Sequence, residues 1–141
     1  MTQINFYNLQ QESEQDRRLF ACRLAEKAYS LGHRVCILTG DDTAASQLDS
    51  LLWSFSPTSF IPHEIITGDH AASTRVSVAV NKLPADATDV VINLSDDAVD
   101  DFESISRVNE IIIQDPELLE QARARFRYYH QAGTRPEMIK L

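Results

Sequence analysis

Basic and aromatic side chains gather near the end of a chain that is otherwise acidic. In EQARARFRYYHQAG, residues 120–133, three arginines alternate with three aromatic residues, whereas the whole chain has 13 Lys+Arg against 21 Asp+Glu. A guanidinium holds a carboxylate or phosphate through two parallel hydrogen bonds, and an aromatic ring offers an apolar surface. The segment therefore suits a nucleic acid or an acidic peptide. The third interpretation is an ordinary solvated helix face.

Helical periodicity separates the residues of this segment. At about 100° per residue, one face collects an apolar stripe that we expect to join the core: Leu118, Leu119, Ala122, Phe126 and Tyr129. Arg123 and Arg127 flank this stripe with His130 near Arg123, and Arg125 lies on the other side. Two guanidiniums beside an apolar rim suit a peptide that carries a carboxylate and a hydrophobic residue together. The alternative is a core helix with a solvated basic edge.

A second cluster of large apolar residues occupies LLWSFSPTSFIPHEI, residues 51–65. The only tryptophan, Trp53, lies near a predicted helix end, and Phe60, Pro62 and His63 follow in a segment bounded by prolines. Such side chains either fill the core beneath a loop or anchor a protein interface, where Trp and Phe concentrate binding energy. The sequence leaves both interpretations open.

Four aspartates follow a predicted strand in VVINLSDDAVDD. Asp96, Asp97 and Asp100 supply the oxygen ligands that Mg²⁺ prefers, which makes a divergent metal-dependent phosphohydrolase one alternative. The other interpretation of residues 96–101 is an exposed acidic loop with helix-capping aspartates. The four histidines show no zinc-ligand spacing: His33, His63, His70 and His130. No nucleophile-elbow motif is present, so the sequence does not predict enzyme activity.

Glycine-rich phosphate-binding turns are missing as well. The chain has four glycines and neither GxxxxGK[ST] nor GxGxxG, the patterns that let backbone N–H groups approach phosphates. No nucleotide, metal or other cofactor is predicted. A net charge of −8 also argues against a broad grip on the DNA backbone, although a direct nucleic-acid-binding module that uses residues 120–133 stays as the alternative function.

The elements that must position these residues follow from apolar periodicity. Strands are predicted at 4–9, 34–39, 63–67, 75–80, 89–94 and 107–114, and helices at 13–32, 40–55, 98–105 and 115–133. Ser13 and Asp115 are the expected N-caps, and Gly32 and Gly133 the expected stops. Apolar strands alternating with helices predict a three-layer, Rossmann-like α/β domain with a mostly parallel sheet and helices on both faces. The closely spaced middle strands allow an antiparallel hairpin.

Domain count and compartment follow from bulk features. No linker or repeat divides residues 1–141, whose length fits a single domain with one core. No run of 18 apolar residues and no secretory signal is seen. Cys22 and Cys36 lie in apolar periodic segments and are expected to be buried reduced thiols. We therefore expect a cytoplasmic protein without membrane contact.

Several stretches also carry a family resemblance. They are Phe6, Tyr7 and Leu9 in the first predicted strand, LAEKAYSLGHRVCILTGD at 24–41, LDSLLWSFSPTSFIPH at 48–63, and ARARFRYYHQAG at 122–133. With these residues the chain resembles the chi-subunit family of bacterial DNA polymerase III. The resemblance implies a Rossmann-like, non-enzymatic clamp-loader accessory subunit that lacks nucleotide chemistry.

The resemblance further implies two partners and their sites. The acidic C-terminal tail of single-stranded-DNA-binding protein would bind at Arg123, Phe126 and Arg127. The family can carry lysine where this chain has Leu119, which would either weaken the pocket or shift its charge toward Arg125 or His130. Leu119 and His130 complete the expected set of five tail-binding residues. The psi subunit would bind at Trp53 and Phe60, with Pro62 and His63 adjacent. A helicase-like repair protein is implied as a competitor for the psi surface.

Overall fold

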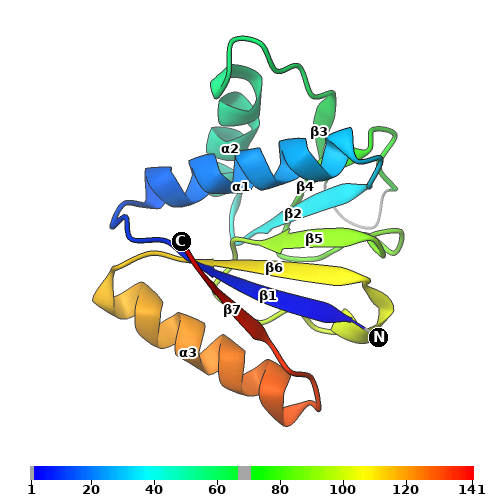
Figure 1. Ribbon diagram of the computed structural model, residues 1–141. Coiled ribbons are helices and arrows are strands. Elements are labelled where there is room, and N and C mark those ends of the chain that lie inside the picture. Colours follow the sequence, from blue (N-terminus) through cyan, green and yellow to red (C-terminus); the bar gives the residue numbers. More distant parts are fainter. Residues whose placement is uncertain (1, 67–70) are drawn as a thin grey trace.

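The computed structural model describes residues 2–66 and 71–141 and consists of seven strands and three α-helices (Figure 1). The elements are β1 (Gln3–Asn8), α1 (Glu14–Ser30), β2 (Val35–Thr39), α2 (Asp42–Ser54), β3 (His63–Ile66), β4 (Val76–Val80), β5 (Val90–Asn93), the 3₁₀ turn η1 (Phe102–Ser104), β6 (Arg107–Ile112), α3 (Pro116–Gln131) and β7 (Glu137–Lys140). Three residues of the predictions lie outside the described residues: Thr67 of the predicted strand 63–67, Gly68 of the loop after it, and His70 of the histidine set.

The strands form one sheet in the order β3-β4-β2-β5-β6-β1-β7, and every pairing in it is parallel. This confirms the predicted Rossmann-like α/β fold. β2 and β5 are buried along their whole length, as expected for strands covered on both faces. The antiparallel hairpin was wrong, because β3 and β4 pair in parallel with His63 opposite Val76. Their register requires the chain to return to the other end of the sheet before β4 begins.

Helices cover both faces of the sheet. α1 and α2 pack on one face (Figure 1). Their residues Cys22, Ala25 and Leu48 join Ile37 and Val78 in one core cluster. On the other face α3 and η1 form a second cluster with alternate strand residues: Tyr129 and Phe102 pack with Phe6, Leu38 and Val91. The alternation of side chains along each strand therefore divides the core into two halves.

Helix boundaries follow the predicted capping residues. The Ser13 hydroxyl accepts a hydrogen bond from the Asp16 N–H at 3.1 Å, and the Asp115 carboxylate accepts from two backbone N–H groups at the start of α3. Gly133 follows α3 with a φ of 97°, a conformation that favours glycine. The helix predicted at 98–105 is only the short turn η1, because Asp101 before it has left-handed backbone geometry.

Strand β7 was not predicted. It follows Pro136 and pairs in parallel with β1 at the edge of the sheet, with only Ile139 of its four residues partly buried. A short, exposed edge strand of this kind shows little hydrophobic alternation. Its place beside β1 brings Met138 toward α3, which matters for the site described below.

The two cysteines are free and buried, as predicted. Burial raises the pKa of the Cys22 thiol to about 12 and that of Cys36 to about 11. No helix in the described part of the chain is long and apolar enough to cross a membrane.

Candidate functional site

A groove of about 350 Å³ lies between α3 and the β1–β7 edge of the sheet. Its apolar lining comes from three strands and the helix: Phe6, Ile112, Leu119, Ala122, Phe126 and Met138. Arg123 and Arg127 complete it from successive turns of α3. We call this the α3 groove. The groove combines an apolar interior with two cations on one side, the combination that the helical periodicity suggested.

The walls of the α3 groove are held by packing between elements. The Phe126 ring lies 5.2 Å from the Phe6 ring in a tilted arrangement, and Phe6 is fully buried. Met138 on β7 is 50% exposed and forms part of the opposite side. The ring pair fixes one wall while the flexible thioether lets the other adapt to an inserted side chain.

Both arginines of the α3 groove are available to a ligand. Arg123 meets Glu120 at 3.4 Å, but the two side chains are 65% and 68% exposed, so water screens the pair. Arg127 is exposed and has no hydrogen-bond or ion-pair partner among the described residues. A carboxylate that enters the groove therefore displaces little protein structure when it bonds to these guanidiniums.

Four of the five predicted tail-binding residues meet at this groove: Leu119, Arg123, Phe126 and Arg127. His130 is exposed on the same helix and is not part of the lining. The sequence did not point to Phe6, Ile112 or Met138 as groove residues, because Phe6 comes from a strand remote in sequence and the positions of β6 and β7 relative to α3 depend on the tertiary fold. Only knowledge of which strands lie beneath α3 would have identified them.

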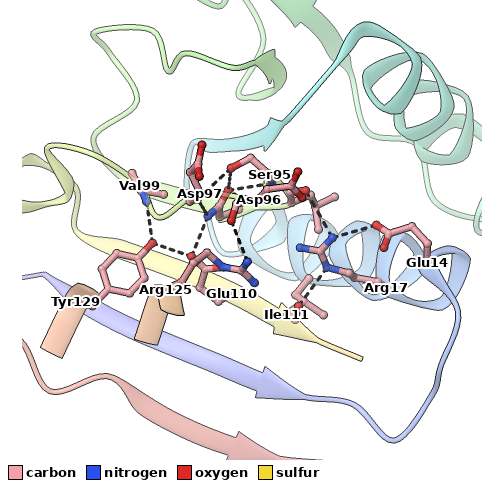
Figure 2. A network of polar contacts seen from close by, with 12 residues as sticks. Glu14, Arg17, Ser95, Asp96, Asp97, Val99, Glu110, Ile111, Arg125 and Tyr129 are labelled. Carbon is pink, nitrogen blue, oxygen red and sulfur yellow. Dashed lines mark hydrogen bonds and ion pairs between the residues drawn. The ribbon is translucent and has the colours of Figure 1, made fainter. Parts of the chain in front are cut away.

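The expectation that Arg125 shares the charge of this site was wrong. Arg125 is 5% exposed, and its Nε donates to Glu110 Oε1 at 2.9 Å while Nη1 donates to the Asp96 carbonyl at 3.2 Å (Figure 2). Glu110 is fully buried on β6. The guanidinium is therefore paired with a carboxylate inside the protein and points away from solvent.

Glu110 is the centre of a buried polar network shown in Figure 2. Its Oε2 accepts from the Tyr129 hydroxyl at 2.7 Å and from Asn93 Nδ2 at 2.9 Å, and the same hydroxyl accepts from the Val99 N–H. Burial, then the adjacent Glu110 charge, raise the pKa of Tyr129, which stays protonated and donates. The network ties α3 to β5, β6 and the loop after β5, and so positions the helix that carries the groove.

The second predicted surface is partly exposed. Trp53 is 50% exposed and Phe60 is 72% exposed, with their rings 5.5 Å apart. Pro62 is half-buried beside them. We call this the Trp53–Phe60 surface. Of the two interpretations left open by the sequence, this exposure favours an interface over a core beneath a loop.

His63 is buried, although the sequence placed it beside Trp53 and Phe60 at the predicted interface. Its side chain is fully buried, with Nδ1 2.7 Å from the Ile61 carbonyl and Nε2 3.1 Å from Asp49 Oδ1. The Trp53 ring lies 4.2 Å from the imidazole, centroid to centroid. His63 therefore supports the indole from beneath and is not itself an exposed contact residue.

The aspartates of the metal alternative do not converge. In residues 2–66 and 71–141 no group of three or more His, Cys, Asp or Glu side chains is placed to hold a metal ion. The Asp96 carbonyl accepts from Arg125, and the Asp100 carboxylate accepts from the Tyr128 hydroxyl at 3.4 Å. These contacts join the acidic loop to α3.

Comparison with known proteins shows the family to which the chain belongs. The family described as DNA polymerase III chi subunit, HolC, matches residues 1–137. The chain belongs to this chi-subunit family. The DNA polymerase III subunit chi of Pseudomonas aeruginosa is 35% identical over 133 residues, which cover 94% of this chain and 92% of the relative.

Two further chi subunits are similar along nearly the whole chain. That of Haemophilus influenzae is 26% identical over 129 residues, 91% of this chain and 90% of its own. That of Escherichia coli K12 is 26% identical over 138 residues, 94% of each chain. The Rossmann-like fold and the sequence therefore agree on a chi subunit, an accessory subunit of DNA replication.

Proposed function

We propose that this chi-family chain is a non-catalytic tether that connects the clamp loader, through the psi subunit, to single-stranded-DNA-binding protein. It would act in the cytoplasm at the replication fork. The observation that carries the proposal is the α3 groove, in which Arg123 and Arg127 stand beside an apolar pocket of about 350 Å³. The ligand is the acidic C-terminal tail of single-stranded-DNA-binding protein, which ends in a hydrophobic residue with a free carboxylate.

The chemistry of the tail complements the groove. The terminal hydrophobic side chain packs between Phe126 and Met138, and its carboxylate bonds to Arg127 and Arg123. Charge-assisted hydrogen bonds of this kind are worth about 1.5–3 kcal/mol each. Aspartates that precede the terminal residue add longer-range attraction to the same two cations. Since both arginines are exposed, salt weakens the contact.

The Trp53–Phe60 surface is the proposed site for psi. Exposed aromatic rings that pack on each other and on a buried imidazole form a preorganised apolar anchor. It lies at the end of α2 and before β3, at the sheet edge opposite β7 and the α3 groove, so that both partners bind together. A helicase-like repair protein would compete with psi for this surface.

Tethering does not require a tight contact with each tail. Many copies of single-stranded-DNA-binding protein coat the template, so a released chi subunit meets another tail nearby. Linked weak contacts raise the effective affinity by orders of magnitude, about 10²–10⁴-fold in other systems. A weak groove therefore keeps the polymerase near the template and still lets it move.

The test is a titration with a labelled peptide in which a run of aspartates precedes a C-terminal phenylalanine. We expect wild type to bind it more weakly as salt rises, and Arg127→Ala to lose about tenfold or more in affinity, since tenfold corresponds to 1.4 kcal/mol. Arg135→Ala, an exposed arginine outside the groove, is the matched control and keeps wild-type affinity. Equal affinity of wild type and Arg127→Ala would refute the proposed tail site. Comparable binding of naked single-stranded DNA would favour the nucleic-acid alternative.

A further inference from the structure

Polar side chains occupy the α1-side face of β1 and β6, where a parallel sheet normally carries apolar residues. Gln3 pairs with Arg107 and Asn5 pairs with Asn109 in the parallel register of the two strands. Asn5 and Asn109 are nevertheless buried, with exposures of 2% and 4%. A row of buried amides next to an exposed arginine is unusual for a region that only has to pack.

These four side chains form a directed chain of hydrogen bonds. Arg107 Nη2 donates to Gln3 Oε1 at 3.4 Å, Gln3 Nε2 donates to Asn5 Oδ1 at 3.2 Å, and Asn5 Nδ2 donates to Asn109 Oδ1 at 3.2 Å. The Asn109 amide nitrogen ends the chain and has no partner among the described residues. This nitrogen is not fully enclosed, so the N–H₂ group can donate to water or to a ligand that reaches it.

The two ends of this chain, Arg107 and Asn109, line a pocket of about 350 Å³ beside α1. The Tyr7 and Phe20 rings, 5.3 Å apart, form an aromatic wall, and Arg23 and Lys27 stand one turn apart on α1. We call it the α1 pocket. Its lining contains no Asp or Glu side chain, although the chain carries 21 of them.

The cations of the α1 pocket are not used inside the protein. Arg23 and Lys27 are exposed and have no ion pair within residues 2–66 and 71–141. His33 also lines the pocket, but its Nδ1 lies 3.2 Å from the Asp89 carboxylate. The pocket therefore offers cations, hydrogen-bond donors and aromatic carbon, which together select a ligand with carboxylates and an apolar group.

We propose that the α1 pocket is a second binding site, for an acidic peptide segment that carries an apolar side chain. Successive residues of β1 serve the two sites, since Phe6 lines the α3 groove and Tyr7 lines the α1 pocket. The two sites therefore lie on opposite faces of the sheet, and peptides occupy them simultaneously. A peptide fits better than a nucleic acid, because the cations are confined to one pocket of a chain whose net charge is −8.

The test uses the Arg123→Ala/Arg127→Ala protein, in which the α3 groove lacks its cations. We expect this protein to retain binding of the labelled peptide with a run of aspartates and a C-terminal phenylalanine. Adding Arg23→Ala and Lys27→Ala should lower the remaining affinity at least about tenfold, since each removes a charged partner. Arg135→Ala in the same background is the control and keeps the remaining affinity.

A second measurement locates the bound peptide. In NMR titrations of the Arg123→Ala/Arg127→Ala protein, the backbone amide signals of Tyr7 and Asn109 should shift with the peptide and stay unchanged in the Arg23→Ala/Lys27→Ala version. Absence of peptide binding in the Arg123→Ala/Arg127→Ala protein would overturn the second site. Peptide binding that survives the loss of Arg23 and Lys27 would also overturn it. Tighter binding of a single-stranded oligonucleotide than of the peptide would overturn the proposal of a peptide ligand. Arg127→Ala in the Arg23→Ala/Lys27→Ala background tests the α3 groove without the α1 pocket, so the two proposals fail separately.

Discussion

Two arginines of one helix, two residues apart, should have opposite effects when each is replaced by alanine. Arg125 is 5% exposed and bonded to the fully buried Glu110, whereas Arg123 is exposed beside the α3 groove. We expect Arg125→Ala to destabilise the fold and to leave tail binding intact in the folded protein. Arg123→Ala should do the reverse.

The magnitude for Arg125→Ala follows from what the substitution leaves behind. Glu110 keeps hydrogen bonds from Tyr129 and Asn93 but loses its opposite charge while it remains fully buried. Breaking a buried ion pair by removing one partner costs about 3–5 kcal/mol, a large part of the roughly 5–15 kcal/mol that stabilises a typical domain. The exposed pair of Arg123 with Glu120 contributes about 0–1 kcal/mol.

The assay is urea unfolding followed by circular dichroism, with thermal unfolding as a second probe. For a chain of this size, each kcal/mol shifts Tm by roughly 2–4 °C, so Arg125→Ala should lower Tm by about 10 °C and Arg123→Ala by less than about 4 °C. Peptide affinity is measured on both proteins below their transitions. A loss under about 1 kcal/mol for Arg125→Ala would refute the assignment of a buried ion pair, because exposed pairs contribute no more than that.

Further predictions concern the second surface, the thiols and a helix cap. Phe60→Ala, at a 72% exposed position, should change stability by less than about 0.5 kcal/mol and abolish psi binding in a pull-down, whereas stable binding would remove Phe60 from the interface. His63→Ala should lower the free energy of unfolding by about 2 kcal/mol or more in urea, because the buried ring lies within hydrogen-bonding distance of the Ile61 carbonyl and the Asp49 carboxylate. Cys22 and Cys36, whose pKa values burial raises to about 12 and 11, should react with iodoacetamide at neutral pH only after denaturation, as read by mass spectrometry; labelling of the native protein would contradict their burial. Asp115→Ala should cost about 1 kcal/mol of thermal stability through loss of the α3 N-cap, and an unchanged Tm would show that the cap is replaceable.

Most of the fold could be predicted from local pattern. The strand 34–39 is a continuous apolar run and becomes β2, buried at every residue, and Ser13 and Asp115 cap the helices that their positions predicted. Strand β7 escaped because a short edge strand gains its order from hydrogen bonds to β1 and not from its own apolar residues. The direction of β4 against β3 escaped because the two strands follow each other closely in the sequence, a spacing that also fits a hairpin.

For the α3 groove, the sequence determined the helix, its apolar stripe and the positions of Arg123 and Arg127 beside that stripe, since these depend only on helical spacing. Tertiary structure decided which arginine is free. Arg125 has the same side chain on the same helix, yet it bonds to Glu110 on β6, fifteen residues earlier in the chain. His63, which we expected at the interface, is instead buried beneath Trp53, where it contacts Asp49, fourteen residues away. Charge and type are local properties of a sequence, but burial and pairing depend on which remote elements the fold places in contact.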